Sequence, residues 1–290
     1  MRILVTGAGG QLAGALERLA GPDREIVAMG AERLDITDAA AVERTVAAVR
    51  PEAIVNAAAY TAVDRAESEP DAARAVNADG AGHLARVATR HGAALVQVST
   101  DFVFAGDLGR PYRPDDATGP LSVYGRTKLE GERAVRDAAP DAAIIRTAWV
   151  YAASGKNFLL TMLRLMGERG SVRVVADQVG SPTAVDGLAA ACVRAAEGRL
   201  GGTWHWTDAG VASWYDFAVA IAEEGLAAGL LRSLPEVAPI RTEDFPTPAR
   251  RPPYSVLDKT STLAAFGLPV RHWRDGLRAT IRTLASANPT

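Results

Sequence analysis

Residues 2–19 read RILVTGAGGQLAGALERL, and this stretch decides the fold. The apolar run within 2–6 predicts a buried strand, and the glycines of 7–10 predict a turn. Leu12, Leu16 and Leu19 then recur at helical spacing. A strand, a glycine turn and a helix in this order are typical of a nucleotide-binding unit, because the turn lets backbone amides approach a phosphate.

The alternation of strand and helix continues through about residue 150. Further strands are predicted at 25–29, 53–57, 94–99 and 142–146, with helices that start at Asp38, at Pro70 (reaching about 91) and at Ser122 (reaching about 138). Strands separated by helical crossovers form a parallel sheet with helices on both faces. The sequence therefore predicts an α/β fold with a Rossmann-type doubly wound parallel sheet.

The pattern changes after about residue 149. Helices are predicted at 157–169, 185–196, 214–224 and from 272 onward, with a short strand at 204–205 and an irregular proline-rich stretch at 235–253. We expect residues 1–150 to form the nucleotide-binding domain, completed by elements from about 181–206. Residues 151–290 are expected to form mainly a smaller α/β substrate-binding lobe.

Composition excludes several classes of protein. The 290 residues carry 32 basic and 34 acidic side chains, so no broad basic field exists to attract nucleic acid. No apolar run approaches the roughly 18 residues of a membrane span. One cysteine, Cys192, and 4 histidines argue against a disulfide framework or a metal cluster and favour a cytoplasmic location. Lysine is scarce, since only Lys128, Lys156 and Lys259 occur.

The spacing of the glycine turn departs from the strict dinucleotide pattern. Leu12 stands where GxGxxG requires its third glycine, whereas Gly7, Gly10 and Ala13 fit a related spacing with a small third residue. Small residues at 56–59 would let a nucleotide lie across the strand ends. A purely structural turn is the alternative interpretation.

The end of the second predicted strand leaves the cofactor's identity open. Gly30 stands where an acid for the adenosine ribose is expected, and the nearby Glu32 and Arg33 favour NADH and NADPH respectively. Asp35 and Ile36 are candidates for recognising adenine. Asp35 is equally suited to capping a turn.

A tyrosine and a lysine lie one helical turn apart in the helix that follows Ser122. Tyr124 and Lys128 would share one face, and so few lysines make this pairing improbable by chance. A neighbouring ammonium group lowers the pKa of a phenol, which suits the phenol to proton transfer. Thr100, at the end of the strand 94–99, would lie at the same sheet edge, although a threonine there is commonly only a cap.

Further motifs recur along nearly the whole chain. They lie at 3–7, 10–12, 56–64, 66–68, 99–104, 123–129, 146–151, 177–178, 180–183 and 245–252. With these motifs the sequence resembles the extended short-chain dehydrogenase/reductase family, and within it the reductases of dTDP-4-keto-6-deoxy sugars. The resemblance implies that NADPH or NADH reduces the C4 keto group of dTDP-4-dehydro-6-deoxy-L-mannose to give dTDP-L-rhamnose.

The resemblance also assigns roles to residues. Tyr124 would donate the proton, Lys128 would lower its pKa and hold the nicotinamide ribose, and Thr100 would complete the catalytic triad. The expected substrate-binding residues are Thr100, Asp101, Tyr124, Lys128, Trp149 and Arg251. The expected cofactor-binding residues are Gly7, Gly10, Gln11, Leu12, Asp35, Ile36, Ala57, Ala59, Tyr60, Thr61, Ser99, Tyr124 and Lys128. For Trp149 and Arg251 the alternatives are a core aromatic at the hinge and an ordinary surface arginine.

Two departures from the resembled family concern the third glycine and a metal. Ala13 replaces the third glycine, a mild change. Some relatives use Mg²⁺ between acidic residues at a dimer interface, whereas the corresponding helix here offers no acid before Glu17. Mg²⁺ is therefore possible by resemblance but without identified ligands, and the protein is expected to be a monomer or a homodimer.

Two alternative functions remain open from the sequence. A sugar-nucleotide dehydratase or epimerase resembles the same family, but a dehydratase needs a second acid where Phe102 stands. The other alternative is a non-catalytic dinucleotide-binding subunit, like the regulatory subunit of methionine adenosyltransferase. The complete set of Thr100, Tyr124 and Lys128 argues against that alternative.

Overall fold

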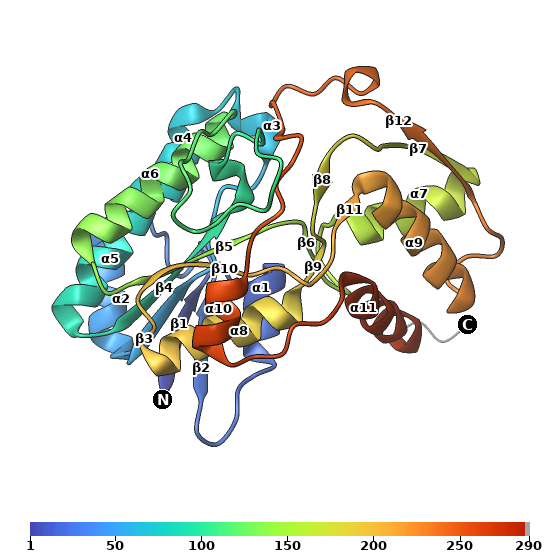
Figure 1. Ribbon diagram of the computed structural model, residues 1–290. Coiled ribbons are helices and arrows are strands. Elements are labelled where there is room, and N and C mark those ends of the chain that lie inside the picture. The colour runs from blue at the N-terminus through green and yellow to red at the C-terminus, as the bar shows by residue number, and fades with distance from the viewer. Residues whose placement is uncertain (288–290) are drawn as a thin grey trace.

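A six-stranded parallel sheet forms the centre of the larger lobe (Figure 1). The computed structural model describes residues 1–287, within which the strand order is β10-β5-β4-β3-β1-β2. The strands are β1 (Arg2–Thr6), β2 (Glu25–Met29), β3 (Ala53–Asn56), β4 (Ala94–Thr100), β5 (Ala143–Thr147) and β10 (Gly202–His205). The chain order reverses between β1 and β3, where ligands bind in such sheets. The predicted doubly wound α/β fold is confirmed.

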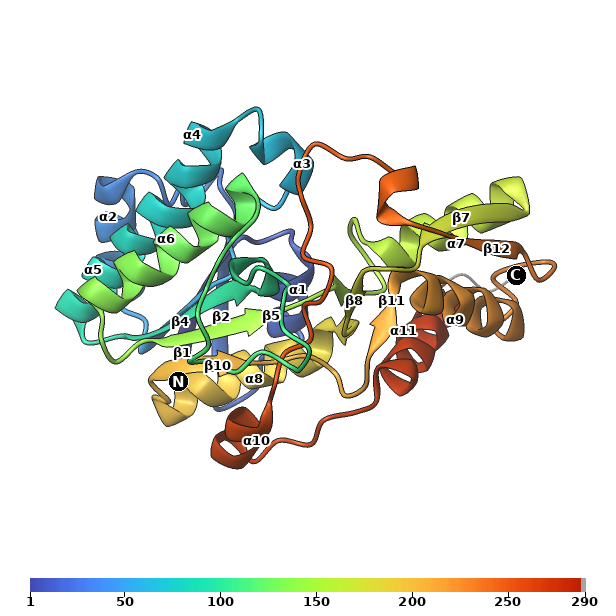
Figure 2. The same ribbon diagram turned by 45° about the horizontal axis from the view of Figure 1, so that its top comes forward.

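Helices cover both faces of this sheet, because successive side chains of a strand point to opposite faces. On one face, Ile3 and Val5 pack in a fully buried cluster with α1 (Gln11–Glu17) and α8 (Val185–Gly198). On the other face, Leu4 belongs to a second buried cluster. The helices of that face are α2 (Ala39–Val49), α5 (Ala81–His91) and α6 (Val123–Ala138) (Figure 2). These two clusters hold the strand ends that carry the site.

The helix predicted from Pro70 to about residue 91 is continuous but changes its hydrogen bonding in the middle. It consists of α4 (Pro70–Arg74), the π-helical η1 (Ala75–Gly80) and α5. Within η1, the Asn77 side chain accepts from the Tyr60 N–H (2.9 Å) and donates to Thr127 Oγ1 (3.1 Å). The π-helical turn therefore ties the loop after β3 to α6.

The smaller lobe packs around an aromatic and aliphatic core of its own. Phe217, Leu159 and Leu277 are fully buried there. Its main elements are α7 (Phe158–Arg169), α9 (Trp214–Ala227), α11 (Trp273–Ala287), β7 (Ser171–Val175) and β12 (Glu236–Ile240) (Figure 2). The chain returns from this lobe through α8 to β10, which pairs with β5 at the edge of the large sheet.

Two short strand pairs lie between the lobes (Figure 1). They are β6 (Val150–Tyr151) with β9 (Thr183–Ala184), which are parallel, and β8 (Val179–Gly180) with β11 (Ala212–Ser213), which are antiparallel. Each pair brings together segments about 30 residues apart in the sequence. These pairs fix the wall of the cleft between the lobes.

The structure corrects the sequence prediction in the C-terminal half. The stretch 235–253 is not wholly irregular, because β12 forms a parallel pair with β7. Pro239 is tolerated since β12 has β7 as its single neighbour and needs no N–H on its other side. Other elements of this half that were not predicted are β7, the short strands β6, β8, β9 and β11, α10 (Thr260–Phe266) and the 3₁₀ turn η3 (Thr242–Asp244). In the N-terminal half, α3 (Val63–Ala66) and the 3₁₀ turn η2 (Asp101–Val103) were not predicted. Within residues 1–287, no helix is both long and apolar enough to cross a membrane.

Candidate active site

A cleft of about 660 Å³ lies between the two lobes, at the carboxyl ends of the sheet strands. Its walls include the glycine turn, the loop after β3, the end of β4, the start of α6 and, from the smaller lobe's side, Trp149 and Trp214. The predicted site residues that line it are Gly7, Gly10, Gln11, Leu12, Ala57, Ala59, Thr61, Ser99, Thr100, Asp101, Tyr124, Lys128, Trp149 and Arg251. Residues separated by about 240 positions in sequence thus meet in one cleft.

The glycine turn has the backbone geometry of a phosphate cradle. Gly7 and Gly9 have φ of 77° and 83°, in the left-handed region that favours glycine. A Cβ on Gly7 would lie 2.9 Å from the Ala58 backbone, so a larger residue would push the two loops apart. Gly10 precedes α1 without a side-chain cap, which leaves the first amides of the helix available. This arrangement fits the diphosphate of a dinucleotide.

A buried chain of hydrogen bonds holds the strand ends under this turn. Thr6 Oγ1 donates to Asn56 Oδ1 (2.6 Å), and Asn56 Nδ2 donates to Gln97 Oε1 (2.7 Å). Thr6 Oγ1 also accepts from the Ala58 N–H (3.1 Å). Three adjacent strands are therefore locked in register where the loop 57–61 enters the cleft. The small residues of this loop were predicted to lie at the site, whereas the buried chain of hydrogen bonds below them was not predicted.

Local packing brings Tyr124 to the end of β4. Ser122 caps α6 by accepting from the Gly125 N–H (3.2 Å). A side chain at Gly125 would collide with the Phe102 carbonyl, so glycine lets the first turn of α6 contact η2. The rings of Phe102 and Tyr124 meet edge to face at 5.5 Å. Thr100, Tyr124 and Lys128 accordingly line one region of the cleft.

Burial controls the protonation of the tyrosine and lysine. It raises the pKa of Tyr124 to about 12, with a further increase from the nearby Asp101 and an opposing decrease from Thr100. Burial also lowers the pKa of Lys128 to about 8, against the charge of Glu132. Lys128 Nζ donates to the Val98 carbonyl (2.7 Å). The lowered phenol pKa expected from the sequence is thus absent here, and Tyr124 keeps its proton near neutral pH.

An ion pair lies inside the protein one helical turn after Lys128. Arg146 donates through Nε and Nη2 to the two carboxylate oxygens of Glu132, at 2.9 and 2.7 Å. Ser99 Oγ donates to the same carboxylate (2.5 Å). The predicted cofactor-binding Ser99 is therefore also part of the support beneath the cleft. Glu132 was not predicted as a site residue, although it stands four residues after Lys128.

Asp101 is a buried carboxylic acid at the edge of the cleft. Its Oδ1 accepts from Thr100 Oγ1 (3.0 Å), while its Oδ2 has no hydrogen-bond partner. Burial raises the pKa of Asp101 to about 6, and the neighbouring hydroxyl groups of Ser255 and Thr100 oppose this increase. The acid orients the Thr100 hydroxyl, which also accepts from the Phe102 N–H (3.2 Å).

The opposite wall carries two stacked tryptophans. The rings of Trp149 and Trp214 lie face to face, with centroids 3.5 Å apart and planes inclined by 7°. Trp149 has φ of 50°, a left-handed conformation that costs a non-glycine residue roughly 1–2 kcal/mol. An aromatic stack contributes about 0.5–1.5 kcal/mol beyond its buried area, which is enough to offset much of that cost. Trp149 was predicted as a site residue, whereas Trp214 was not.

Two cationic side chains reach the cleft besides Lys128. Arg251 pairs with Asp64 through two hydrogen bonds of 3.1 and 2.9 Å, and this guanidinium lowers the pKa of the Asp64 carboxyl. Lys156 is exposed at the cleft wall and forms no ion pair with any residue in 1–287. The scarcity of lysine was the signal that could have marked Lys156.

Three predicted cofactor residues lie outside the cleft wall. Asp35 Oδ1 accepts from the N–H and hydroxyl of Thr37, which is the turn-capping role. Ile36 is buried in the core of the α2 face. The Tyr60 hydroxyl donates to Glu69 (2.6 Å). None of the three lines the cleft, although Tyr60 packs with Tyr124 against the same small buried cluster at the start of α6.

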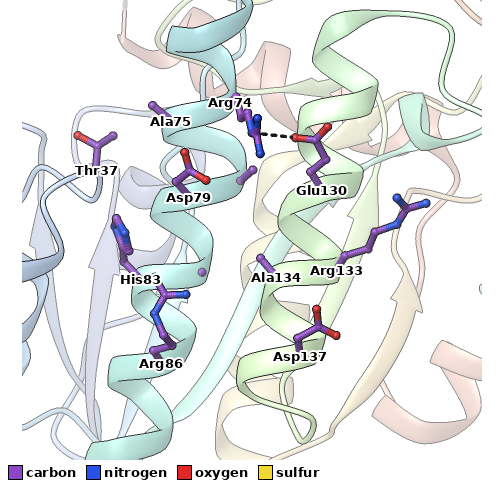
Figure 3. A pocket seen from close by; sticks show the side chains of 12 residues that line it. Thr37, Arg74, Ala75, Asp79, His83, Arg86, Glu130, Arg133, Ala134 and Asp137 are labelled. Atoms are coloured by element: carbon purple, nitrogen blue, oxygen red, sulfur yellow. Dashed lines mark ion pairs between the residues drawn. The ribbon is translucent and has the colours of Figure 1, made fainter.

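A second hollow lies between α5 and α6 on the outside of the larger lobe (Figure 3). Its lining mixes basic and acidic side chains, and Arg74 pairs with Glu130 at 3.4 Å. None of the predicted site residues lines it. Neither this hollow nor any other part of 1–287 gathers three potential His, Cys, Asp or Glu ligands for a metal. Residues 1–287 therefore provide no group of side chains that could hold the Mg²⁺ implied by the resemblance.

Comparison with known proteins agrees with this geometry. A family model described as the RmlD substrate binding domain matches residues 1–286. The dTDP-4-dehydrorhamnose reductase of Aggregatibacter actinomycetemcomitans is 41% identical over 285 residues, covering 96% of this chain and 97% of that protein.

Solved structures show the same similarity. The dTDP-4-dehydrorhamnose reductase of Clostridium acetobutylicum superposes with a TM-score of 0.93 at 40% identity, covering 98% of this chain and 99% of that one. That of Bacillus anthracis, solved in complex with NADP, has a TM-score of 0.90 at 38% identity, with coverage of 96% and 98%. With a family match over nearly its whole length and relatives at about 40% identity, among them the three dTDP-4-dehydrorhamnose reductases named above, this chain belongs to the RmlD family.

Proposed function

We propose that this protein is a dTDP-4-dehydrorhamnose reductase, which converts dTDP-4-dehydro-6-deoxy-L-mannose to dTDP-L-rhamnose with NADPH or NADH. The observation that carries the proposal is the meeting of Thr100, Tyr124 and Lys128 with the glycine turn in one cleft. Full-length relatives bear the name of this activity. The proposal makes the cleft an active site with a dinucleotide on one side and a sugar nucleotide on the other.

The glycine turn and the loop after β3 would hold the dinucleotide. The glycine turn of Gly7 and Gly10 would place the diphosphate at the free amides of the first turn of α1, and Gln11, Leu12, Ala57, Ala59, Thr61 and Ser99 would complete the contacts. Asp35 and Ile36 remain proposed for adenine and Tyr60 for the dinucleotide, although their side chains lie outside the cleft wall. When bound, the reduced nicotinamide supplies the hydride that reaches C4 of the sugar.

Tyr124 would supply the proton. As a C–H bond forms at C4 and the carbonyl π bond breaks, the oxygen gains negative charge and takes the phenolic proton of Tyr124. Burial raises the pKa of that phenol to about 12, so the proton to be donated is present at neutral pH. Thr100 would position the carbonyl oxygen through its hydroxyl. The Lys128 ammonium would stabilise the phenolate that remains.

The remaining cleft residues would hold the sugar nucleotide. Arg251 and the unpaired Lys156 are suited to a diphosphate, since both present cationic nitrogen to the cleft. Trp149 would contact the sugar, and Asp101 would orient the Thr100 hydroxyl toward that sugar. Substrate binding thus draws on both lobes.

The decisive experiment adds dTDP-4-dehydro-L-rhamnose to the purified protein with NADPH or NADH and follows oxidation of the cofactor by absorbance. We expect turnover, and the Tyr124→Phe variant should lose roughly a hundredfold or more of it. Failure to oxidise either cofactor, or near-full activity of Tyr124→Phe, would contradict the proposal. Turnover of other NDP-4-keto sugars in the same assay would indicate a related reductase, and co-purification with a partner without turnover would indicate a regulatory subunit.

A further inference from the structure

We propose that Trp214 is a positioning residue that fixes the ring of Trp149 in the cleft before the sugar nucleotide binds. This inference rests on the proposed function, in which Trp149 contacts the substrate. Trp214 itself extends the cleft wall beside Trp149. Its effect on the substrate would act mainly through the ring that it holds.

The stack is anchored in the core of the smaller lobe. Trp214 packs against Phe158 with centroids 4.7 Å apart, and Phe158 stacks on the buried Phe217 at 5.5 Å. Trp149 meets the opposite end of this series, at 3.5 Å from Trp214 and nearly parallel to it. A chain of aromatic contacts therefore connects a buried core to a ring at the cleft.

The backbone of Trp149 needs external support. Its φ of 50° is rare for a bulky side chain and persists only where neighbouring structure enforces it. The Trp149 carbonyl accepts from the Thr183 N–H at 3.1 Å. The next residue, Val150, pairs with Thr183 in the β6–β9 ladder. These bonds hold the main chain, and the stack with Trp214 holds the ring.

Gly180 leaves the space that the ring of Trp149 occupies. A Cβ at this position would lie 2.7–2.9 Å from three atoms of the indole. Gly180 pairs with Ala212 in the β8–β11 ladder, two residues before Trp214. The indole of Trp149 is thus confined by Gly180, which lies in the β8–β11 ladder, and by Trp214, which follows β11 directly.

The start of α9 fixes the backbone that carries the Trp214 ring. Ser213 and Asp216 form a reciprocal capping box, in which each side chain accepts from the other's backbone N–H at 3.0 and 2.8 Å. Trp214 is the first residue of that helix, so its backbone has little freedom. The two ladders and this cap explain why the 180–183 motif lies beside the site. None of the residues in this motif was assigned a catalytic role.

Holding Trp149 in advance removes an ordering cost from substrate binding. Trp214→Ala should therefore weaken binding of the sugar nucleotide by roughly five- to tenfold, while kcat and cofactor affinity change less than twofold. Trp214→Phe keeps an aromatic face and should restore most of the affinity. Trp204→Phe is the matched control, because Trp204 packs on Phe266 in the other lobe, outside the cleft.

For each variant the experiment measures the KM and kcat for dTDP-4-dehydro-L-rhamnose, the affinity for the cofactor, the Kd for dTDP-L-rhamnose by calorimetry, and the NMR shifts of the Trp149 ring protons. Stacking at 3.5 Å places those protons in the ring current of Trp214. We expect Trp214→Ala to lose that shift and to raise KM and Kd together. Gly180→Ala, which displaces Trp149 from the other side, should raise both constants as well.

The inference is overturned if Trp214→Ala loses the ring-current shift with an unchanged Kd. It is equally overturned if kcat and cofactor affinity fall as strongly as substrate affinity does, which indicates a merely structural role. Failure of the wild-type protein to turn over the substrate, with dTDP-L-rhamnose still bound, contradicts the proposed function alone. In that case the ratio of Kd values between Trp214→Ala and the wild type still decides the inference.

Discussion

Glu132 and Arg146 form a two-pronged ion pair whose side chains are only 1% and 4% exposed. Glu132 stands one helical turn after Lys128, and its charge raises the lysine pKa against the effect of burial. Arg146 belongs to β5 and lies over the Phe104 ring, with 5.0 Å between its guanidinium carbon and the ring centre. The pair therefore links the helix of the catalytic residues to the central sheet.

Removing the charge of Glu132 should destabilise the protein strongly. Glu132→Gln leaves the Arg146 guanidinium buried without a counter-charge, which costs about 3–5 kcal/mol of unfolding free energy. Urea denaturation measures this. Glu168→Gln is the control, because the Arg164–Glu168 pair is more than half exposed and should change stability by less than about 1 kcal/mol. Equal effects of the two substitutions would contradict the assigned importance of the buried pair.

The activity should fall on the alkaline side as Lys128 loses its proton. Burial lowers the pKa of Lys128 to about 8, whereas Tyr124, with its pKa raised to about 12, stays protonated there. We therefore expect kcat/KM to decrease above about pH 8, with the ammonium as the group that is lost. Lys128→Arg keeps its charge at these pH values and should lower the activity but remove this decrease. A decrease near pH 8 that persists in Lys128→Arg would assign it to another group.

The sequence was most informative where chemistry and local pattern coincide. The stretch 2–19 predicted β1, the glycine turn and α1, because strand, turn and helix are local features. Tyr124, Lys128 and Thr100 were predicted to lie together from a helix spacing and a sheet edge, and the structure brings them to one cleft. The positions of these residues follow from the topology of the parallel sheet. The alternation of strands and helices along the sequence is enough to predict that topology.

Elements held by distant partners escaped prediction. β12 forms against β7, about 65 residues away, and Pro239 within it is a local signal against a strand. Trp214 reaches Trp149 only through the β8–β11 ladder and the fold of the smaller lobe. No periodicity within one segment reports such contacts, because their stability depends on residues elsewhere in the chain.

The choice between NADH and NADPH should depend on Glu32. The Glu32 carboxylate lies against Gly30 at the end of β2, where an acid favours a ribose diol and repels a 2′-phosphate. Glu32→Gln should therefore raise the ratio of kcat/KM for NADPH over NADH by about two- to fivefold at low salt. Arg33→Gln, the neighbouring opposite charge, should lower that ratio. Shifts of both variants in the same direction would exclude a charge-based preference.

Arg251 should contribute to binding of the sugar nucleotide rather than to the chemical step. Its guanidinium lies at the cleft, oriented by Asp64 and by the Ala249 carbonyl (3.1 Å). Arg251→Met removes a cation suited to a diphosphate, so KM for the sugar nucleotide should rise roughly tenfold with little change in kcat. The adjacent Arg250 is exposed and does not line the cleft, which makes Arg250→Met the matched control.

Asp64→Asn separates the positioning of Arg251 from its charge. Asp64 is 41% exposed and Arg251 23% exposed, so their ion pair contributes little to stability and acts chiefly on orientation. Weakening it should raise KM less than Arg251→Met does, with an unchanged free energy of unfolding. Because a diphosphate contact is electrostatic, KM should increase with ionic strength in the wild type and less so in Arg251→Met. Equal salt dependence and equal KM in Arg251→Met and Arg250→Met would show that Arg251 is an ordinary surface arginine whose partner is Asp64 alone.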